Sequence, residues 1–267
     1  MSSKSNPASA FLMAAPDRYN DDTPALYDII GDVHGCRNEL IALIVRLGYQ
    51  PDGSHPAGRH LIFLGDLVNR GYANIQTADW VIQGALTHRL LFIPGNNDWD
   101  LVKWLRGENN KLSPGLLSTI RELADDPISS PFSLAFQEIV QSAPPYLVLD
   151  HGQLIVAHAG IEADRIGKTD PETIHFTLHG EKIGVDEATG RIIRRDWAAG
   201  YSGSVFIVYG HTPVERAEIR NRTINIDTGC VLGGYLTAFR WPEKEIVQVR
   251  SSYDWRQLRP QVEESQE

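Results

Sequence analysis

The sequence predicts an α/β fold, in which buried strands are flanked by helices. Two observations support this. Five short apolar runs recur along the chain, and the first three are each followed by a stretch whose apolar residues are at helical spacing. Each run also stops close to an Asp, Asn or His that has Gly beside it, as strands do when they deliver side chains to the functional edge of an open α/β sheet. The runs span residues 26–30, 61–64, 90–93, 154–157 and 205–209.

The N-terminal half alternates strands and helices. Apolar residues at helical spacing predict a helix over 37–47, which stops at Gly48, and a second helix over 75–86. A third helix is predicted over 99–105. Because strands alternate with helices, this half is expected to form βαβ units with largely parallel strands.

The rest of the chain is less regular. Residues 107–145 have a helical pattern but contain five prolines, which predicts a small helical insert near the ligand face. Residues 162–200 are polar and Gly-rich with weak periodicity, and we expect a long loop or a short hairpin there. The C-terminal third is expected to form consecutive strands joined by short turns. These strands are predicted over 205–209, 223–226, 235–240 and 245–249.

Length and composition predict one domain with two tails. A chain of 267 residues fits a single large domain, which we expect over 25–252. Residues 1–24 are rich in Ser, Pro, Asn and Asp and are expected to be flexible, and the acidic segment 253–267 is expected to be loose. Hydrophobic content of 42% and charged content of 22% are those of an ordinary soluble globular protein.

Composition also disfavours several classes of protein. The apolar runs are far shorter than the roughly 18 residues that a membrane span needs. The apolar patch at 8–15 is at the short limit for a signal peptide, so no targeting is expected. A net charge of −9 disfavours an extended nucleic-acid surface, which needs Lys and Arg to meet phosphates. Two cysteines make no disulfide framework, so a reduced, cytoplasmic setting is expected.

The polar residues at the five strand ends form a possible ligand set for metal ions. Two Asp, one Asn and three His combine oxygen and nitrogen donors, which suits hard or borderline divalent metals. There are enough donors for two ions. The six residues are Asp32, His34, Asp66, Asn96, His158 and His211.

Five motifs in a fixed order resemble those of the calcineurin-like metallophosphoesterases of the phosphoprotein-phosphatase type, over about residues 26–250. The resemblance implies a β-sandwich of mixed sheets flanked by helices. The motifs are Gly31-Asp32-Val33-His34-Gly35, Gly65-Asp66 with Arg70-Gly71, Gly95-Asn96-Asn97-Asp98, His158-Ala159-Gly160 and Gly210-His211-Thr212.

Two branches of this family are the most similar. Residues 208–214 and 224–238 resemble the phosphatase module of bacterial polynucleotide kinase-phosphatases. The motifs Gly31-Asp32-Val33-His34-Gly35-Cys36 and Asp227-Thr228-Gly229-Cys230 are similar to those of symmetrical diadenosine tetraphosphatases. The chain has no Gly-x-x-x-x-Gly-Lys-Ser/Thr phosphate loop, so no kinase module is expected.

The resemblance implies a dinuclear site. By position, Asp32 and His34 would bind one divalent ion, and Asp66 would bridge it to a second ion. Asn96, His158 and His211 would complete the second site. Manganese is the expected metal, with iron, zinc, nickel or cobalt as alternatives. Such a pair of ions can hold a bridging hydroxide as nucleophile and neutralise phosphoryl oxygens.

Five further side chains are expected to contact or support the substrate and the ligands. Arg70 is expected to clamp phosphate, because a guanidinium donates two parallel hydrogen bonds to it. Asp227 could orient a ligand His or a loop, or be an ordinary turn residue. Arg194 and Arg195, with Trp197, could contact a leaving group, or form an exposed charged strand with one packed aromatic.

The chain departs from the family pattern at the acid position. Asn69 stands where members commonly have Asp, and Asn97 where they have the His that is thought to protonate the leaving oxygen. Asn can donate a hydrogen bond to phosphate, but it has no proton to give near neutral pH. Losing a general acid costs roughly 10²–10⁴ in rate. A good leaving group suffers less, so a dinucleoside polyphosphate is the expected substrate.

Other functions stay open at this stage. The resemblance also permits a polynucleotide-end phosphatase, a 2′,3′-cyclic phosphodiesterase or a serine/threonine protein phosphatase. A catalytically weak module that binds a phosphorylated ligand is the non-enzyme alternative, which the complete set of inferred ligands disfavours. The expected partner is a small-molecule or nucleotide phosphate.

Overall fold

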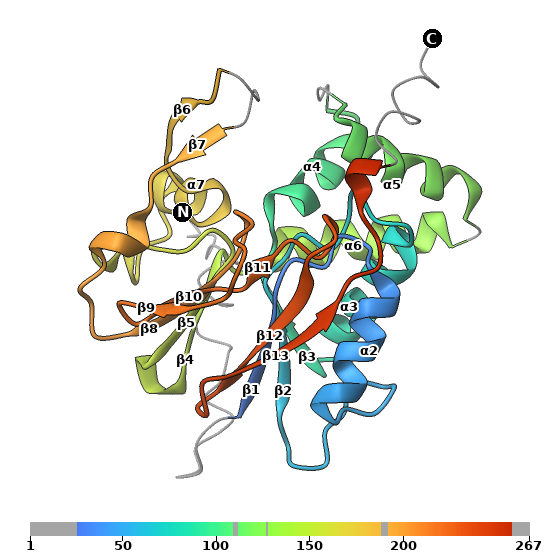
Figure 1. The fold of residues 1–267 in the computed structure, drawn as a ribbon. Helices are drawn as coiled ribbons and strands as arrows, with labels where there is room; N and C mark the ends of the chain where they lie inside the picture. The colour runs from blue at the N-terminus through green and yellow to red at the C-terminus, as the bar shows by residue number, and fades with distance from the viewer. Residues whose placement is uncertain (1–25, 109–111, 127, 188–191, 258–267) are drawn as a thin grey trace, which may run out of the picture.

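The computed structural model describes residues 26–108, 112–126, 128–187 and 192–257. In this part of the chain two mixed β-sheets pack against each other, with helices on their outer faces (Figure 1). The first sheet has the order β11-β12-β1-β2-β3, with β13 beside β12, and the second has the order β4-β5-β8-β10-β9. The predicted α/β fold of mixed sheets with flanking helices is confirmed.

The first sheet combines a parallel and an antiparallel part. β1, β2 and β3 are parallel, as the βαβ pattern predicts, whereas β12 pairs antiparallel with β1. β11 and β13 both pair antiparallel with β12. The strands are β1 (Tyr27–Ile30), β2 (His60–Phe63), β3 (Leu90–Phe92), β11 (Asp227–Thr228), β12 (Tyr235–Trp241) and β13 (Glu245–Arg250).

The second sheet places two further site strands side by side. β5 and β8 are parallel, as are β8 and β10, so their carboxyl ends lie at the same edge. The strands are β4 (Tyr146–Leu149), β5 (Leu154–Ala157), β8 (Phe206–Tyr209), β9 (Ile219–Arg220) and β10 (Thr223–Asn225). Because β8 and β10 are parallel, no short turn joins them; β9 lies in the connection. The expectation of consecutive strands joined by short turns is correct only for β12 and β13.

Alternation along the strands divides the core into layers. In β1, Ile29 faces the cluster between the sheets, whereas Ile30 faces the cluster under the helices. In β5, Val156 faces the space between the sheets and Ile155 faces the outer side. Both faces of each sheet are therefore buried, which explains the continuous apolar runs in the sequence.

Helices α2 to α6 cover the outer face of the first sheet (Figure 1). Helix α2 ends where the sequence predicts, because Gly48 takes a left-handed φ of 94°. α4 starts three residues before its predicted start, because the Asp98 side chain caps the backbone N–H of Gly95. No described helix is long and apolar enough to cross a membrane. The helices are α2 (Arg37–Leu47), α3 (Asn74–Leu86), α4 (Asn96–Leu105), α5 (Pro114–Asp125) and α6 (Ser129–Ser142).

Residues 162–200 contain a helix that the sequence analysis did not predict. Asp170 caps α7 (Pro171–His179) by accepting a hydrogen bond from the N–H of Thr173, and Phe176 is buried against the second sheet. The expectation of a long loop is wrong there, whereas the expected hairpin forms from β6 (Lys182–Val185) and β7 (Ile192–Arg194). Short 3₁₀ turns are η1 (Asp150–Gly152), η2 (Ala163–Arg165), η3 (Trp197–Gly200) and η4 (Trp255–Gln257).

The two expected tails have different outcomes. Residues 1–24 lie outside the described part of the chain. The segment expected to be loose from 253 is packed over its first residues: Trp255 is buried, and the hydroxyl of Tyr253 donates to the carbonyl of Arg70 at 2.7 Å. Aromatic burial and this hydrogen bond hold the segment, and its acidic composition did not reveal either contact.

Candidate metal centre and active site

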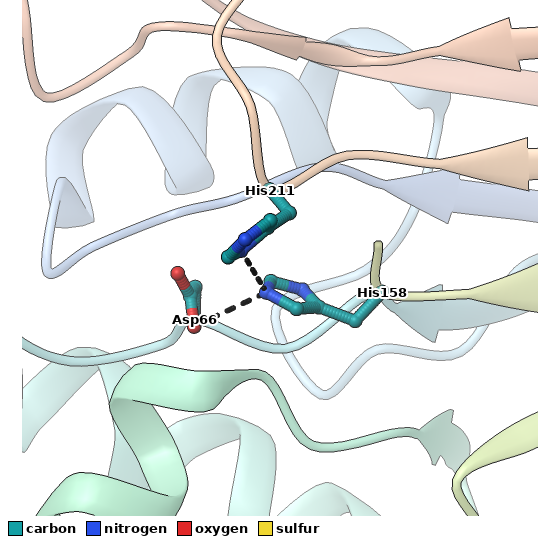
Figure 2. Close-up of side chains that lie close together, drawn as sticks. All are labelled: Asp66, His158 and His211. Carbon is teal, nitrogen blue, oxygen red and sulfur yellow. Dashed lines mark hydrogen bonds and ion pairs between the residues drawn. The ribbon is translucent and has the colours of Figure 1, made fainter. Parts of the chain in front are cut away.

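The carboxyl ends of five strands bring the six predicted ligand residues together. Two groups of side chains converge there, and they share Asp66. Within each group the possible ligand atoms lie within 4.8 Å of one another. The first group is Asp32, His34 and Asp66, and the second is Asp66, His158 and His211 (Figure 2). The Oδ1 of Asn96 lies 3.3 Å from His158 Nε2 and so adjoins the second group.

Backbone carbonyls select the tautomer of two histidines. The Nδ1 of His158 lies 2.8 Å from the carbonyl oxygen of Leu64, and the Nδ1 of His34 lies 2.9 Å from that of Val68. A carbonyl can only accept, so each Nδ1 carries the proton. Each Nε2 is then left with a lone pair that points into the site, as in histidines that bind metals.

The second group contains more acceptors than protons. His158 Nε2 lies 3.1 Å from His211 Nδ1 and 3.5 Å from Asp66 Oδ1. Burial lowers the pKa of both histidines, so both rings are neutral. At most one proton can lie between the two ring nitrogens, and among the described residues the buried Nε2 of His211 has no hydrogen-bond partner. A cation could take the lone pairs of His158 Nε2, of one ring nitrogen of His211 and of Asp66, so the residues fit a divalent ion with nitrogen and oxygen ligands.

Three buried carboxylates also indicate positive charge at this place. Burial, together with Asp227 and Asp66, raises the pKa of Asp32. Burial opposes ionisation of Asp66 as well, but the neighbouring histidines outweigh it, so the pKa of Asp66 is lowered. Uncompensated buried charges are costly. Divalent ions at the two groups would remove the repulsion among these carboxylates.

Asp227, the expected supporting residue, lies beside Asp32. Burial raises the pKa of Asp227 to about 7, and Asp66 adds to the effect. One oxygen of Asp227 accepts a hydrogen bond from the N–H of Gly229 at 3.0 Å, as a turn residue does. This hydrogen bond agrees with the expected turn residue, and the expected role of orienting a ligand His or a loop stays a prediction.

Asp66 is held by the first turn of α4, which carries Asn97. The backbone N–H of Asn97 donates to Asp66 Oδ1 at 2.9 Å, and the Asn97 side-chain amide donates to Oδ2 at 2.6 Å. Asp98 connects the segment after β2 to the start of α4, because its carboxylate accepts hydrogen bonds from the N–H groups of Asp66, Leu67 and Gly95. Asp98 was not singled out in the sequence, although it follows Asn97 in the motif.

A buried chain of side chains occupies the acid position. The Nδ2 of Asn69 donates to Oδ1 of Asn97 at 2.9 Å, and the hydroxyl of Thr119 donates to Oδ1 of Asn69 at 2.9 Å. Thr119 belongs to α5, so the helical insert contributes to the site. The amide of Asn97 is therefore oriented by its neighbours, but none of these three side chains carries an acidic proton.

Two glycines pack closely against carboxylates of the site, and three site residues have an unusual backbone conformation. A Cβ at Gly95 would overlap the carboxylate of Asp66, and a Cβ at Gly210 would overlap that of Asp32. His34, Asp66 and His211 have φ angles of 45°, 50° and 73°, which non-glycine residues seldom adopt. Such strain is concentrated at functional sites.

Arg70 reaches the first group. One terminal nitrogen of its guanidinium, NH1, lies 2.8 Å from His34 Nε2 and donates to the lone pair there. Burial lowers the pKa of His34 to about 4, and the charge of Arg70 contributes. The predicted phosphate clamp is thus at the edge of the ligand set, with its cationic end pointing inward.

Arg194, the last residue of β7, and Arg195, which follows it, differ in their surroundings. Arg195, the expected substrate contact, is ion-paired with Glu162 at 2.5 Å and with Glu181. Arg194 is half-buried, donates its Nε–H to the carbonyl of His179 at 2.9 Å and interacts electrostatically with Asp66 and His211. Among the described residues Arg194 makes no ion pair. The sequence analysis named both arginines as possible contacts of a leaving group.

Comparison with known proteins agrees with this geometry. Residues 27–234 match the family model of the calcineurin-like phosphoesterases. The chain is similar to the bis(5′-nucleosyl)-tetraphosphatase PrpE [asymmetrical] of Bacillus subtilis (strain 168), with 45% identity over 88% of this chain and 99% of the relative. The protein of the same name from Geobacillus sp. (strain WCH70) is 45% identical over 84% of this chain and 94% of the relative.

Solved structures share the fold at low identity. A crystal structure of a candidate diadenosine tetraphosphatase superposes with a TM-score of 0.62 at 22% identity, over 86% of this chain and 95% of the other. A serine/threonine phosphatase of Saccharomyces cerevisiae gives a TM-score of 0.55 at 13% identity, over 87% and 81%. The matched family model, which spans most of the chain and all five motifs, establishes that this protein belongs to the calcineurin-like phosphoesterase family.

Proposed function

We propose that this phosphoesterase hydrolyses dinucleoside tetraphosphates at a site that holds two divalent ions. The observation that carries the proposal is the pair of ligand groups that share Asp66. The relatives named as bis(5′-nucleosyl)-tetraphosphatases support the substrate, because they are similar along almost the whole chain.

The proposed division of roles follows the sequence analysis. Asp32 and His34 would hold one ion, Asn96, His158 and His211 would hold the other, and Asp66 would contribute to both. When bound, the ions neutralise the phosphoryl oxygens and activate water for attack. The chemistry of the donors suits manganese, iron, zinc, nickel or cobalt, of which we propose manganese.

The protein's own side chains bind and orient the phosphate. Arg70 lies beside His34 of the first group and Arg194 interacts with His211 of the second, so one guanidinium group can hold the scissile phosphate and the other the phosphate next to it. Asn97 keeps Asp66 in place through two hydrogen bonds. An anhydride oxygen leaves as a weakly basic phosphate, so the missing proton donor at Asn97 costs little for this substrate.

Product analysis tests the proposal. Purified protein with Mn²⁺ and diadenosine tetraphosphate should yield ATP and AMP, as the names of the relatives imply; two ADP would instead match the symmetrical branch that the sequence resembles. Asp66→Asn should abolish both hydrolysis and the bound metal, measured by elemental analysis. The same activity in that variant would indicate a contaminant.

A substrate panel separates the alternatives. It comprises an oligonucleotide with a terminal phosphate, a 2′,3′-cyclic nucleotide and a phosphoserine peptide. If any of these has a higher kcat/KM than diadenosine tetraphosphate, the proposed substrate is wrong. Stable binding of them all without turnover in metal-loaded protein would favour the binding module.

A further inference from the structure

A cavity of about 310 Å³ lies beside the second ligand group, with which it shares His211, and Gly210 also lines it. Sites for small molecules typically measure roughly 300–1,000 Å³, so this volume suits one nucleotide rather than a whole dinucleotide. The cavity continues from His211 between β8, β10 and the segment after β7. Arg70, at the first ion group, does not line it.

The lining carries an excess of positive charge, although the chain as a whole has a net charge of −9. Its charged residues are Arg194, Arg195, Arg216, Arg220, Asp196 and Glu218. Arg195 is neutralised by Glu162 and Glu181, and Arg220 by Asp196 at 2.6 Å.

Two of these arginines remain available for a ligand. Among the described residues neither Arg194 nor Arg216 makes an ion pair. Arg194 is half-buried near the ions, whereas Arg216 is exposed. The cavity therefore offers one cationic group close to the reacting phosphate and a second that solvent reaches, which matches a chain of phosphates rather than a single one.

An aromatic wall accompanies these charges. Tyr209 is half-buried and lines the cavity, and its ring centroid lies 4.9 Å from that of Trp197. Trp197 itself is packed, with its indole N–H donated to the carbonyl of Ala159. An aromatic ring that is supported from behind offers a surface on which a base can stack, and stacking on protein aromatics contributes about 1–3 kcal/mol per base.

We propose that this cavity binds one nucleoside of the substrate with its adjoining phosphates, while the scissile phosphate lies at the ions. The proposal rests on the proposed function and adds a residue-level account of substrate length. The cavity fixes the distance between the nucleoside and the ions, and thereby selects which phosphoanhydride is hydrolysed. Arg194 contacts the phosphate next to the scissile one, and Arg216 contacts the phosphates nearer the nucleoside.

One experiment measures kcat and KM for diadenosine tetraphosphate in Arg216→Gln. We expect KM to rise about tenfold, because a charge-assisted hydrogen bond is lost in a partly solvated place, with kcat nearly unchanged. Arg222→Gln is the matched control, since Arg222 is exposed directly before β10 but does not line the cavity. Equal KM values in the two variants would overturn the proposal.

A second experiment uses no catalysis. Calorimetric titrations of wild-type protein in EDTA compare ATP with inorganic triphosphate; we expect ATP to bind at least about tenfold more tightly, and to lose this advantage in Tyr209→Leu. Equal affinities would show that the cavity does not take the nucleoside. If wild type fails to hydrolyse diadenosine tetraphosphate with any metal, the proposed function fails, and these titrations still decide the cavity.

Discussion

A double substitution, Asn69→Asp with Asn97→His, would supply the proton donor that the site lacks. Position 97 is nearly buried and lies against Asp66, and position 69 faces it at 2.9 Å. The hydroxyl of Thr119 already donates to one oxygen of residue 69, so a carboxylate there would keep its second oxygen for an imidazole N–H at 97. The surroundings are thus arranged to orient the new acid.

The expected gain depends on the leaving group. A positioned general acid contributes roughly 10²–10⁴ in rate, which corresponds to about 2.7–5.5 kcal/mol of barrier. An alkoxide needs that proton, whereas a phosphate that leaves from an anhydride needs it little. We expect kcat/KM to rise about 100-fold for an alkyl phosphate monoester and less than about threefold for diadenosine tetraphosphate.

Steady-state kinetics measure kcat/KM for the alkyl phosphate monoester and for diadenosine tetraphosphate. The metal content of each preparation is measured as well. Each single substitution serves as a control, because an unoriented imidazole or an unpaired carboxylate should gain much less. Thr119→Val in the double variant should remove part of the gain. The reasoning is refuted if both substrates speed up by the same factor, or if neither does in variants that retain both ions.

Three further outcomes are expected. Removal of metal with EDTA should abolish hydrolysis and lower Tm, since ions that bind only the folded chain stabilise it by about 2.7 kcal/mol at a hundredfold excess over Kd; an unchanged Tm after verified removal would contradict this. In metal-free protein the His34 contribution to the free energy of unfolding should fall as pH drops from 6.5 towards 4, because burial lowers the pKa of His34 to about 4 and the unfolded chain takes up the proton first. Asp32 and Asp227, whose pKa values burial raises, act in the opposite direction, so the His34 contribution is measured as the difference between wild type and His34→Asn. Urea titrations should show that wild type changes less favourably than His34→Asn between pH 7 and pH 5; the same change in both proteins would contradict this. Asp98→Ala should cost about 3 kcal/mol in the same assay, because three backbone N–H groups lose their acceptor; an unchanged urea midpoint would show that water replaces it.

The convergence of the ligand residues was predictable because strand ends are local features. Asp32, Asp66 and His158 each follow a buried strand within one to three residues, and neighbouring parallel strands end at one edge. The sequence therefore indicated which residues meet, without any knowledge of how the two sheets pack. The motif order then matched them to a family, and the family model agrees.

The substrate side was less predictable for physical reasons. Whether Arg194 or Arg195 faces the site depends on the side of β7 on which each lies, and Ile192 and Ile193, on the same strand, are both exposed, so no buried face reveals the register. The signal for α7 was present in Asp170 and the proline after it, but nine residues give too little periodicity to recognise. The contact of Thr119 with Asn69 joins positions 50 residues apart, and such pairings leave no local pattern.

The replacement of the acid by Asn97 is better explained by a change of substrate than by loss of catalysis. A decayed site has no reason to retain buried charge, yet Asp32 and Asp66 remain buried in this chain, with three histidines around them. Asn97 also donates its backbone N–H to one oxygen of Asp66 and its side-chain amide to the other, so its side chain helps to orient this carboxylate. A site that keeps its ion ligands oriented but has no proton donor is suited to phosphoanhydrides, whose leaving groups depart without one.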